Sequence, residues 1–148
     1  MKLTSTAFKE GASIPKQYGY KEANSNPPLS IQEVPKGTKS LALIMDDPDV
    51  PPQVRKDRMW VHWVMYNIEP TVSQIPENCV ALALLGKNTG GERAYMGPAP
   101  PDGEHRYFFK LYALDTKLSE VVEGTKEALL QAMEGHILAY AELMGRYS

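Results

Sequence analysis

The stretch that decides the fold reads Gly97-Pro98-Ala99-Pro100-Pro101-Asp102-Gly103-Glu104-His105-Arg106-Tyr107-Phe108-Phe109-Lys110-Leu111-Tyr112. Its three prolines hold φ at about −65° and donate no backbone hydrogen bond, while its glycines permit close backbone approach. From His105 onward no breaker interrupts the chain, and alternation places His105, Tyr107, Phe109 and Leu111 on one face of a strand. The stretch predicts a stiff loop that presents a histidine and a tyrosine to one side of a sheet. A proline-rich connector before an ordinary core strand fits it equally well.

Two other apolar runs predict strands. Ser40–Met45 has the near-continuous apolar pattern of a strand buried on both faces. The acidic, proline-rich turn Asp46–Pro52 follows it, and we expect the central strand to stop there. Met59–Ile68 predicts a second strand with Trp60, His62, Val64 and Tyr66 on one face, and with Trp63 and Met65 on the other. Residues 69–78 are expected to form a loop, and the apolar run 80–85 is short.

The two ends of the sequence differ in pattern. Residues 1–38 are rich in proline and glycine and leave room only for short strands, of which Leu29–Val34 is one. Helical spacing appears only near the other end, where Thr125 is a plausible N-cap for a helix that ends at Gly135. A second helical stripe, Ile137, Tyr140, Ala141 and Met144, predicts another short helix ending near Gly145. We interpret His136, at the junction, as a structural or capping residue.

Composition limits the classes of protein. The 148 residues fit one domain, residues 1–148, with 43% hydrophobic and 23% charged side chains. A net charge of −2 gives no general attraction to nucleic acid. Cys79 is the single cysteine, which excludes an internal disulfide and a cysteine-rich zinc module, and its apolar surroundings favour a buried thiol. The sequence has no secretion signal or membrane span, so we expect a cytoplasmic protein.

Four side chains could form a site if they converge: Asp47, His62, His105 and Tyr107. A carboxylate raises the pKa of a neighbouring histidine, and a protonated histidine pair beside the proline loop suits a phosphate-like anion. Trp60 suits an apolar or cationic group of the same ligand. Asp47, His62 and His105 also permit a metal triad that holds iron or zinc. Because the sequence has no metal-ligand spacing and no Gly-x-Ser-x-Gly elbow, we favour binding over catalysis and expect no cofactor or metal.

Three separated motifs resemble one known family, in the right order. They are Asp47-Pro48-Asp49-Val50-Pro51, Trp60-Val61-His62-Trp63, and the stretch from Gly97 to Tyr107. The chain resembles the phosphatidylethanolamine-binding proteins, also called Raf-kinase-inhibitor-like proteins, and is most similar to their short bacterial and archaeal branch. The resemblance covers nearly the whole chain. It implies a mainly β fold, a two-sheet antiparallel β-sandwich with short helices.

The resemblance also implies a small pocket for anions and phosphorylated head groups. By motif position its lining would be Asp47, Trp60, His62, Gly97, Pro98, His105 and Tyr107, with Asp49 and Pro101 in support. Some members have a cis peptide before the tryptophan, which here would fall near Arg58-Met59. The chain departs from the family pattern at Ile31, where many bacterial relatives have tryptophan, and at Ala99, which is often cysteine, serine or glycine.

The leading hypothesis is a non-enzymatic binding or regulatory protein for phosphate or a head group such as phosphoethanolamine. One alternative is an interaction module that inhibits a kinase or protease through its surface loops. Another is a small metal-assisted enzyme that uses Asp47, His62 and His105. The expected partners are therefore a small anionic ligand and, in the second case, a protein, with the chain as a monomer or homodimer.

Overall fold

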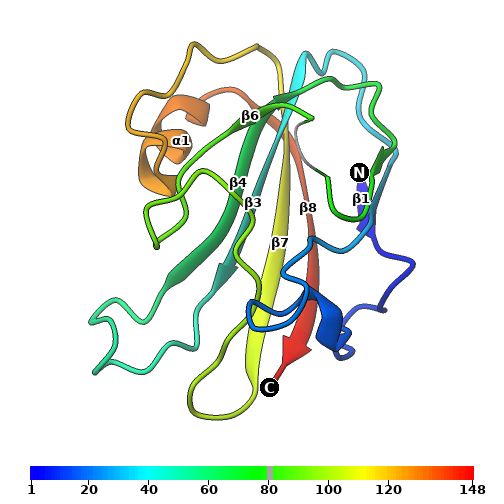
Figure 1. Cartoon of the computed structure of the whole chain (residues 1–148). Coiled ribbons are helices and arrows are strands. Elements are labelled where there is room, and N and C mark those ends of the chain that lie inside the picture. The colour runs from blue at the N-terminus through cyan, green and yellow to red at the C-terminus, as the bar shows by residue number, and fades with distance from the viewer. Residues whose placement is uncertain (80–81) are drawn as a thin grey trace.

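A computed structural model describes residues 1–79 and 82–148 and contains two antiparallel sheets (Figure 1). The smaller sheet has the strand order β1 (Lys2–Thr4), β2 (Leu29–Gln32) and β5 (Gln74–Ile75). The larger has the order β6 (Leu84–Leu85), β4 (Trp60–Ile68), β3 (Ser40–Asp47), β7 (His105–Leu114) and β8 (Ile137–Tyr147). A 3₁₀ helix, Lys16–Tyr18, and the helix α1, Lys126–Met133, complete the regular elements of the described residues. The predicted β-sandwich is confirmed.

Two cores hold the layers together. The larger core lies between the sheets and includes Leu3, Ile31 and Ile75 from the smaller sheet and Leu43 and Phe109 from the larger one. The smaller core lies on the other face of the larger sheet, which α1 covers with Leu129 and Met133. The side-chain hydroxyl of Thr125 accepts from the Ala128 N–H, as the predicted N-cap requires.

β3 is the central strand and is buried along its whole length. The expectation that it stops before the acidic turn is wrong by two residues, because β3 continues through Asp46 and Asp47. Asp46 pairs with Val61 on one side and Phe108 on the other, and Asp47 pairs with Trp60. The carboxylates are tolerated in a buried strand because each has cationic partners, described below.

The second predicted C-terminal helix is wrong. Residues 137–147 form β8, which pairs with β7 from His105↔Tyr147 to Leu114↔Ile137. From Ala141 onward the burial alternates, with Ala141, Leu143, Gly145 and Tyr147 facing inward. The helical spacing of the apolar residues permits a helix. Pairing with the long neighbouring strand β7 instead satisfies the backbone hydrogen bonds of residues 137–147 and makes them a strand.

Strict alternation along β4 also fails. Val64 and Tyr66 belong to the smaller core and Trp63 and Met65 to the larger one, as predicted. His62, however, packs edge-on against Tyr107, a residue of the larger core. The register of β3 with β4 shifts between Met45 and Asp46, and this irregularity turns His62 to the same side as Trp63.

Four smaller expectations concern short segments or single peptide bonds. The predicted loop 69–78 contains the short strand β5, Gln74–Ile75. In the apolar run 80–85, Val80 and Ala81 lie outside the described residues. No peptide bond among the described residues is cis, including the one before Met59; instead Arg58 has a positive φ of 57°. No helix in the described ranges is long and apolar enough to cross a membrane.

The antiparallel pairing brings the chemically important positions to one end of the larger sheet. Asp47 is the last residue of β3, Trp60 the first of β4 and His105 the first of β7. The register pairs Asp47 with Trp60 and His105 with Tyr147. Figure 1 shows the C-terminus at this end of the sheet and α1 near the opposite end.

Candidate functional site

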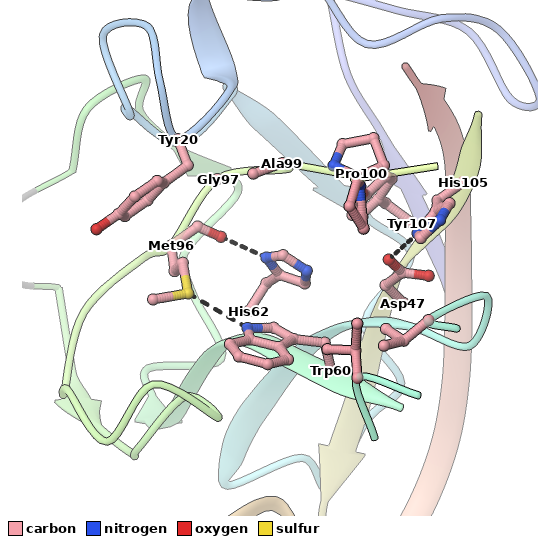
Figure 2. Close-up of a pocket in the computed structure, with 13 residues that line it drawn as sticks. Tyr20, Asp47, Trp60, His62, Met96, Gly97, Ala99, Pro100, His105 and Tyr107 are labelled. Atoms are coloured by element: carbon pink, nitrogen blue, oxygen red, sulfur yellow. Dashed lines mark hydrogen bonds and ion pairs between the residues drawn. The ribbon is translucent and has the colours of Figure 1, made fainter. Parts of the chain in front are cut away.

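A cavity of about 400 Å³ opens at this end of the sheet (Figure 2). Its walls come from the loops after β3 and before β7, from the starts of β4 and β7, and from Tyr20. The lining residues are Tyr20, Asp47, Val50, Val54, Trp60, His62, Met96, Gly97, Ala99, Pro100, Pro101, His105 and Tyr107. Most of these side chains are apolar, and the few polar ones converge on one side, which is the usual composition of a small-molecule site.

His105 and Asp47 form the buried polar centre. The His105 Nδ1 lies 2.6 Å from the Asp47 Oδ2, and both side chains are almost fully buried. The other Asp47 oxygen, Oδ1, accepts the Asp49 N–H at 2.7 Å. Both carboxylate oxygens are therefore used within the protein, and the imidazole is fixed in orientation.

A second carboxylate faces the other nitrogen of the same ring. The Asp102 Oδ1 lies 2.5 Å from the His105 Nε2. An ionised carboxylate only accepts, so with both carboxyl groups ionised each ring nitrogen carries hydrogen and His105 is an imidazolium cation. Burial alone would lower the pKa of His105, but its hydrogen bonds to Asp47 and Asp102 outweigh burial and raise it. Burial also raises the pKa of Asp47. We place the proton on His105 because a second carboxylate holds it there.

His62 has the opposite character. Its Nδ1 donates to the Met96 carbonyl at 2.7 Å, and the Met96 N–H donates to the His62 carbonyl at 2.9 Å. Burial lowers the pKa of His62 to about 4, so the ring is neutral at pH 7 and its Nε2 is an acceptor. Figure 2 shows this second nitrogen turned away from Met96, toward the middle of the cavity.

Tyr107 and Trp60 complete the walls. The Tyr107 ring lies edge-on to His62 at 5.2 Å and stacks beside His105 at 6.4 Å between ring centroids. Burial, and then the charge of Asp47, raises the pKa of the Tyr107 hydroxyl, so it stays a hydrogen-bond donor. The Trp60 Nε1–H points at the Met96 sulfur at 3.2 Å, which fixes the indole against the cavity.

The loops around the cavity are tied to the rest of the fold. Asp49 accepts both the backbone N–H and the guanidinium of Arg106, which lowers the pKa of its carboxyl and fixes the turn after β3. Gly97 donates its N–H to Asn24, and a Cβ at Gly97 would stand 2.2 Å from the Tyr18 carbonyl oxygen. This position therefore requires glycine, because the loop packs directly against backbone.

The comparisons with known proteins agree with this fold. The family model described as phosphatidylethanolamine-binding protein matches residues 4–148. The chain belongs to the phosphatidylethanolamine-binding protein family. It is 53% identical to a phosphatidylethanolamine-binding protein homolog from Chlamydia trachomatis, with a TM-score of 0.96 and coverage of 99% of this chain and 96% of that one.

Two further members of the family place the chain in its bacterial and archaeal branch. One is the UPF0098 protein of Methanothermobacter thermautotrophicus, 46% identical over 153 residues that cover 99% of this chain and 98% of the relative. The other is Escherichia coli YbcL, whose structure superposes with a TM-score of 0.87 at 28% identity and covers 99% of this chain and 97% of that one.

Six of the seven pocket residues expected from the family motifs line the cavity: Asp47, Trp60, His62, Gly97, His105 and Tyr107. Pro98 does not; it is buried behind the loop, where its carbonyl accepts the Tyr20 N–H. Of the two supporting residues, Pro101 lines the cavity directly, and Asp49 holds the turn as described.

Sequence reasoning missed several lining residues, and Asp102. Tyr20, Val50, Val54, Met96, Ala99 and Pro100 also face the cavity. Ala99 and Pro100 lie inside the family motif, so their place in the rigid loop could have predicted that they line the cavity. Tyr20 and Met96 reach the site through loop packing that no spacing in the sequence indicates.

Other sequence-predicted groups lie away from the cavity. His136 is exposed, with its Nδ1 2.8 Å from Asp115 Oδ1 and its N–H bonded to the Met133 carbonyl. Cys79 is half-buried against the larger core, and burial raises the pKa of its thiol. Within residues 1–79 and 82–148, no three His, Cys, Asp or Glu side chains are grouped so that they could hold a metal ion.

Proposed function

We propose that this protein is a non-enzymatic binding protein whose cavity holds a small ligand with a phosphate or phosphorylated head group, such as phosphoethanolamine. The observation that carries the proposal is the charge state of His105, an imidazolium held by two carboxylates at the edge of an apolar cavity. A buried cation beside neutral donors is what an anionic group requires.

The other polar groups refine the class of ligand. His105 carries one positive charge, while Asp47 and Asp102 carry two negative charges. With both carboxylates in place, a ligand that brings only negative charge is bound less tightly than a zwitterion, whose ammonium is compensated by a carboxylate or by the Trp60 face. The Tyr107 hydroxyl supplies a donor and the His62 Nε2 an acceptor. This balance favours a phosphoryl group that carries a nearby amine.

Cavity size supports a ligand of moderate dimensions. A volume of about 400 Å³ lies at the lower end of the range for small-molecule sites, about 300 to 1,000 Å³. Val50, Val54 and Met96 line it with apolar surface. A head group with a short apolar extension fills such a space, with its phosphoryl group at the histidine end.

Thermal unfolding with added ligand tests the proposal. The wild type, His105→Gln and His136→Gln would be titrated with phosphate, phosphoethanolamine and ethanolamine. A ligand that binds only the native state raises the free energy of unfolding by about 2.7 kcal/mol at a hundredfold excess over Kd. We expect saturable stabilisation by phosphoethanolamine in the wild type and in His136→Gln, and none in His105→Gln. Absence of a shift in the wild type, or equal shifts in all three proteins, would overturn the proposal.

A further inference from the structure

Asp102 is an unusual neighbour for a ligand-binding histidine. Its carboxylate bonds to the His105 Nε2, yet its side chain is 53% exposed while that of His105 is 4% exposed. The two residues are only three positions apart, on the loop that leads into β7. One side of a buried cation is thus covered by a solvent-exposed anion from the protein itself.

The partner on the other nitrogen is of a different kind. Asp47 is 3% exposed in its side chain and is held in turn by the Asp49 N–H, so it cannot leave Nδ1 without strand β3 moving. Nε2 is therefore the nitrogen of His105 whose partner is exposed and can be exchanged. In the structure the Asp102 carboxylate occupies the hydrogen-bonding position on that nitrogen.

The loop leaves Asp102 free to withdraw. Pro101 fixes the backbone before it, and Gly103 follows with a φ of 119°. No heavy atom lies within 4 Å of the point where a Cβ would stand on Gly103, so this part of the loop faces open space. Rotation of the Asp102 side chain into solvent needs no movement of the strand. An ion pair with one exposed partner is also weak enough to be exchanged for a ligand.

We propose that Asp102 is an internal competitor for the anion position on His105, which every anionic ligand must displace. The inference rests on the proposed function, because it concerns the same site. When a group of the protein itself occupies the position, the affinity of every ligand that needs that position falls by the same factor. The fraction of time that the group spends there sets this factor. Anions of different structure that take Nε2 therefore share this factor, while a neutral ligand held by the apolar walls is unaffected. Asp102 thus disfavours anions relative to neutral ligands of the same cavity.

The test compares Asp102→Ala and Asp102→Asn with the wild type by calorimetric titration. The probes are inorganic phosphate, phosphoethanolamine and phenyl phosphate, with benzyl alcohol as the neutral probe. We expect the affinity for all three anions to rise by the same factor in Asp102→Ala, roughly threefold to tenfold, given what a half-exposed charged hydrogen bond contributes. The affinity for benzyl alcohol should not change.

Glu104→Gln is the matched control. It removes a carboxylate from the same exposed loop, one that faces Arg146 rather than His105. If general removal of negative charge were the cause, Glu104→Gln would strengthen anion binding as much as Asp102→Ala, and the proposal would fail. The ¹⁵N resonance of His105 Nε2 gives an independent readout, because phosphate should perturb it at lower concentration in Asp102→Ala than in the wild type.

The remaining outcomes separate the two proposals. Equal anion affinities in the wild type and both variants would show that Asp102 does not compete, while the proposed binding function stands. Weaker phosphoethanolamine but unchanged phosphate binding in Asp102→Ala would make Asp102 an ammonium contact and overturn the competition. If no anion binds any of the proteins, the proposed function itself fails.

Discussion

Asp46 and Asp47 are consecutive residues of β3 whose carboxylates serve opposite faces of the larger sheet. Asp47 bonds to His105 at the cavity, whereas the Asp46 Oδ2 accepts Lys110 at 3.0 Å and Lys126, the first residue of α1, at 2.7 Å. One dipeptide therefore contacts the cavity histidine on one side of the sheet and, on the other, the only α-helix of the described residues.

The first prediction concerns the Asp46 side. Asp46→Asn should lower the free energy of unfolding by about 3 kcal/mol, because two largely buried ammonium groups lose their shared carboxylate. Urea denaturation measures the loss. Asp115→Asn, which removes an exposed carboxylate, is the control and should change stability by less than about 1 kcal/mol. Equal small effects in both variants would mean that the Asp46 cluster does not anchor α1.

The second prediction concerns acid stability. Burial lowers the native pKa of His62 to about 4, below its ordinary value of 6.5, so the unfolded chain protonates first as the pH falls. His62 therefore favours folding above pH 6.5 and costs stability as the pH drops toward 4. At about 1.4 kcal/mol per pKa unit the full loss is about 3 kcal/mol. His62→Gln should lose less stability than the wild type between pH 7 and pH 4.5, measured by urea unfolding.

His105 supplies the contrast to that experiment. Its carboxylate partners raise its native pKa, so its contribution to stability is complete below pH 6.5 and is lost as the pH rises through the native pKa. His105→Gln should therefore lower stability more at pH 6 than at pH 9. The same pH trend in the His62 and His105 variants would contradict the opposite charge states assigned to the two rings.

The third prediction concerns the cavity loop. Gly97→Ala places a methyl group 2.2 Å from the Tyr18 carbonyl oxygen and 2.7 Å from the Tyr20 nitrogen, both backbone atoms that cannot rotate away. We expect a loss of about 2 to 4 kcal/mol in stability and weaker ligand binding, since the loop must shift. Ala99→Ser, on an exposed position of the same loop, should leave the thermal midpoint nearly unchanged. A fully stable Gly97→Ala protein would show that the packing of this loop is loose.

The fourth prediction concerns the Tyr107 hydroxyl. Tyr107→Phe keeps the ring that packs against His62 but removes a donor from the cavity. The affinity for phosphoethanolamine should fall roughly fivefold, and stability should change by less than about 1 kcal/mol. Tyr112→Phe makes the same chemical change on a residue that packs against the smaller core, outside the cavity lining, and should bind as the wild type does. Equal binding by both variants would remove Tyr107 from the site.

Local patterns in the sequence predicted most of the sheet. The alternation after His105 and the apolar run before Asp46 gave the strands and the buried faces of β7 and β3, because side-chain period alone determines them. The N-cap Thr125 gave α1 for a similarly local reason. β8 was mistaken for a helix because Ile137, Tyr140, Ala141 and Met144 recur at helical spacing, and the partner that selects the strand lies more than twenty residues earlier in the chain.

The cavity was predictable only as far as the family motifs reach. Those motifs placed Asp47, His62 and His105, and the structure brings Asp47 and His105 into contact. The position of Asp102 on His105 depends on the path of a loop with a positive-φ glycine, and the Tyr20 wall depends on contacts between segments far apart in the chain. His62 is neutral and His105 is protonated because the two rings differ in burial and in their hydrogen-bond partners. The spacing of residues in the sequence does not indicate either property.

The pairing of β7 with β8 affects when the site can form during synthesis. His105 and Tyr107 lie opposite Tyr147 and Gly145, so the strand that carries these two cavity-lining residues has an open edge until residues 137–147 have left the ribosome. A nascent chain that has reached only α1 already contains every residue that lines the cavity. Without β8 one edge of β7 stays unpaired, so the geometry of the cavity is complete only after β8 has been translated.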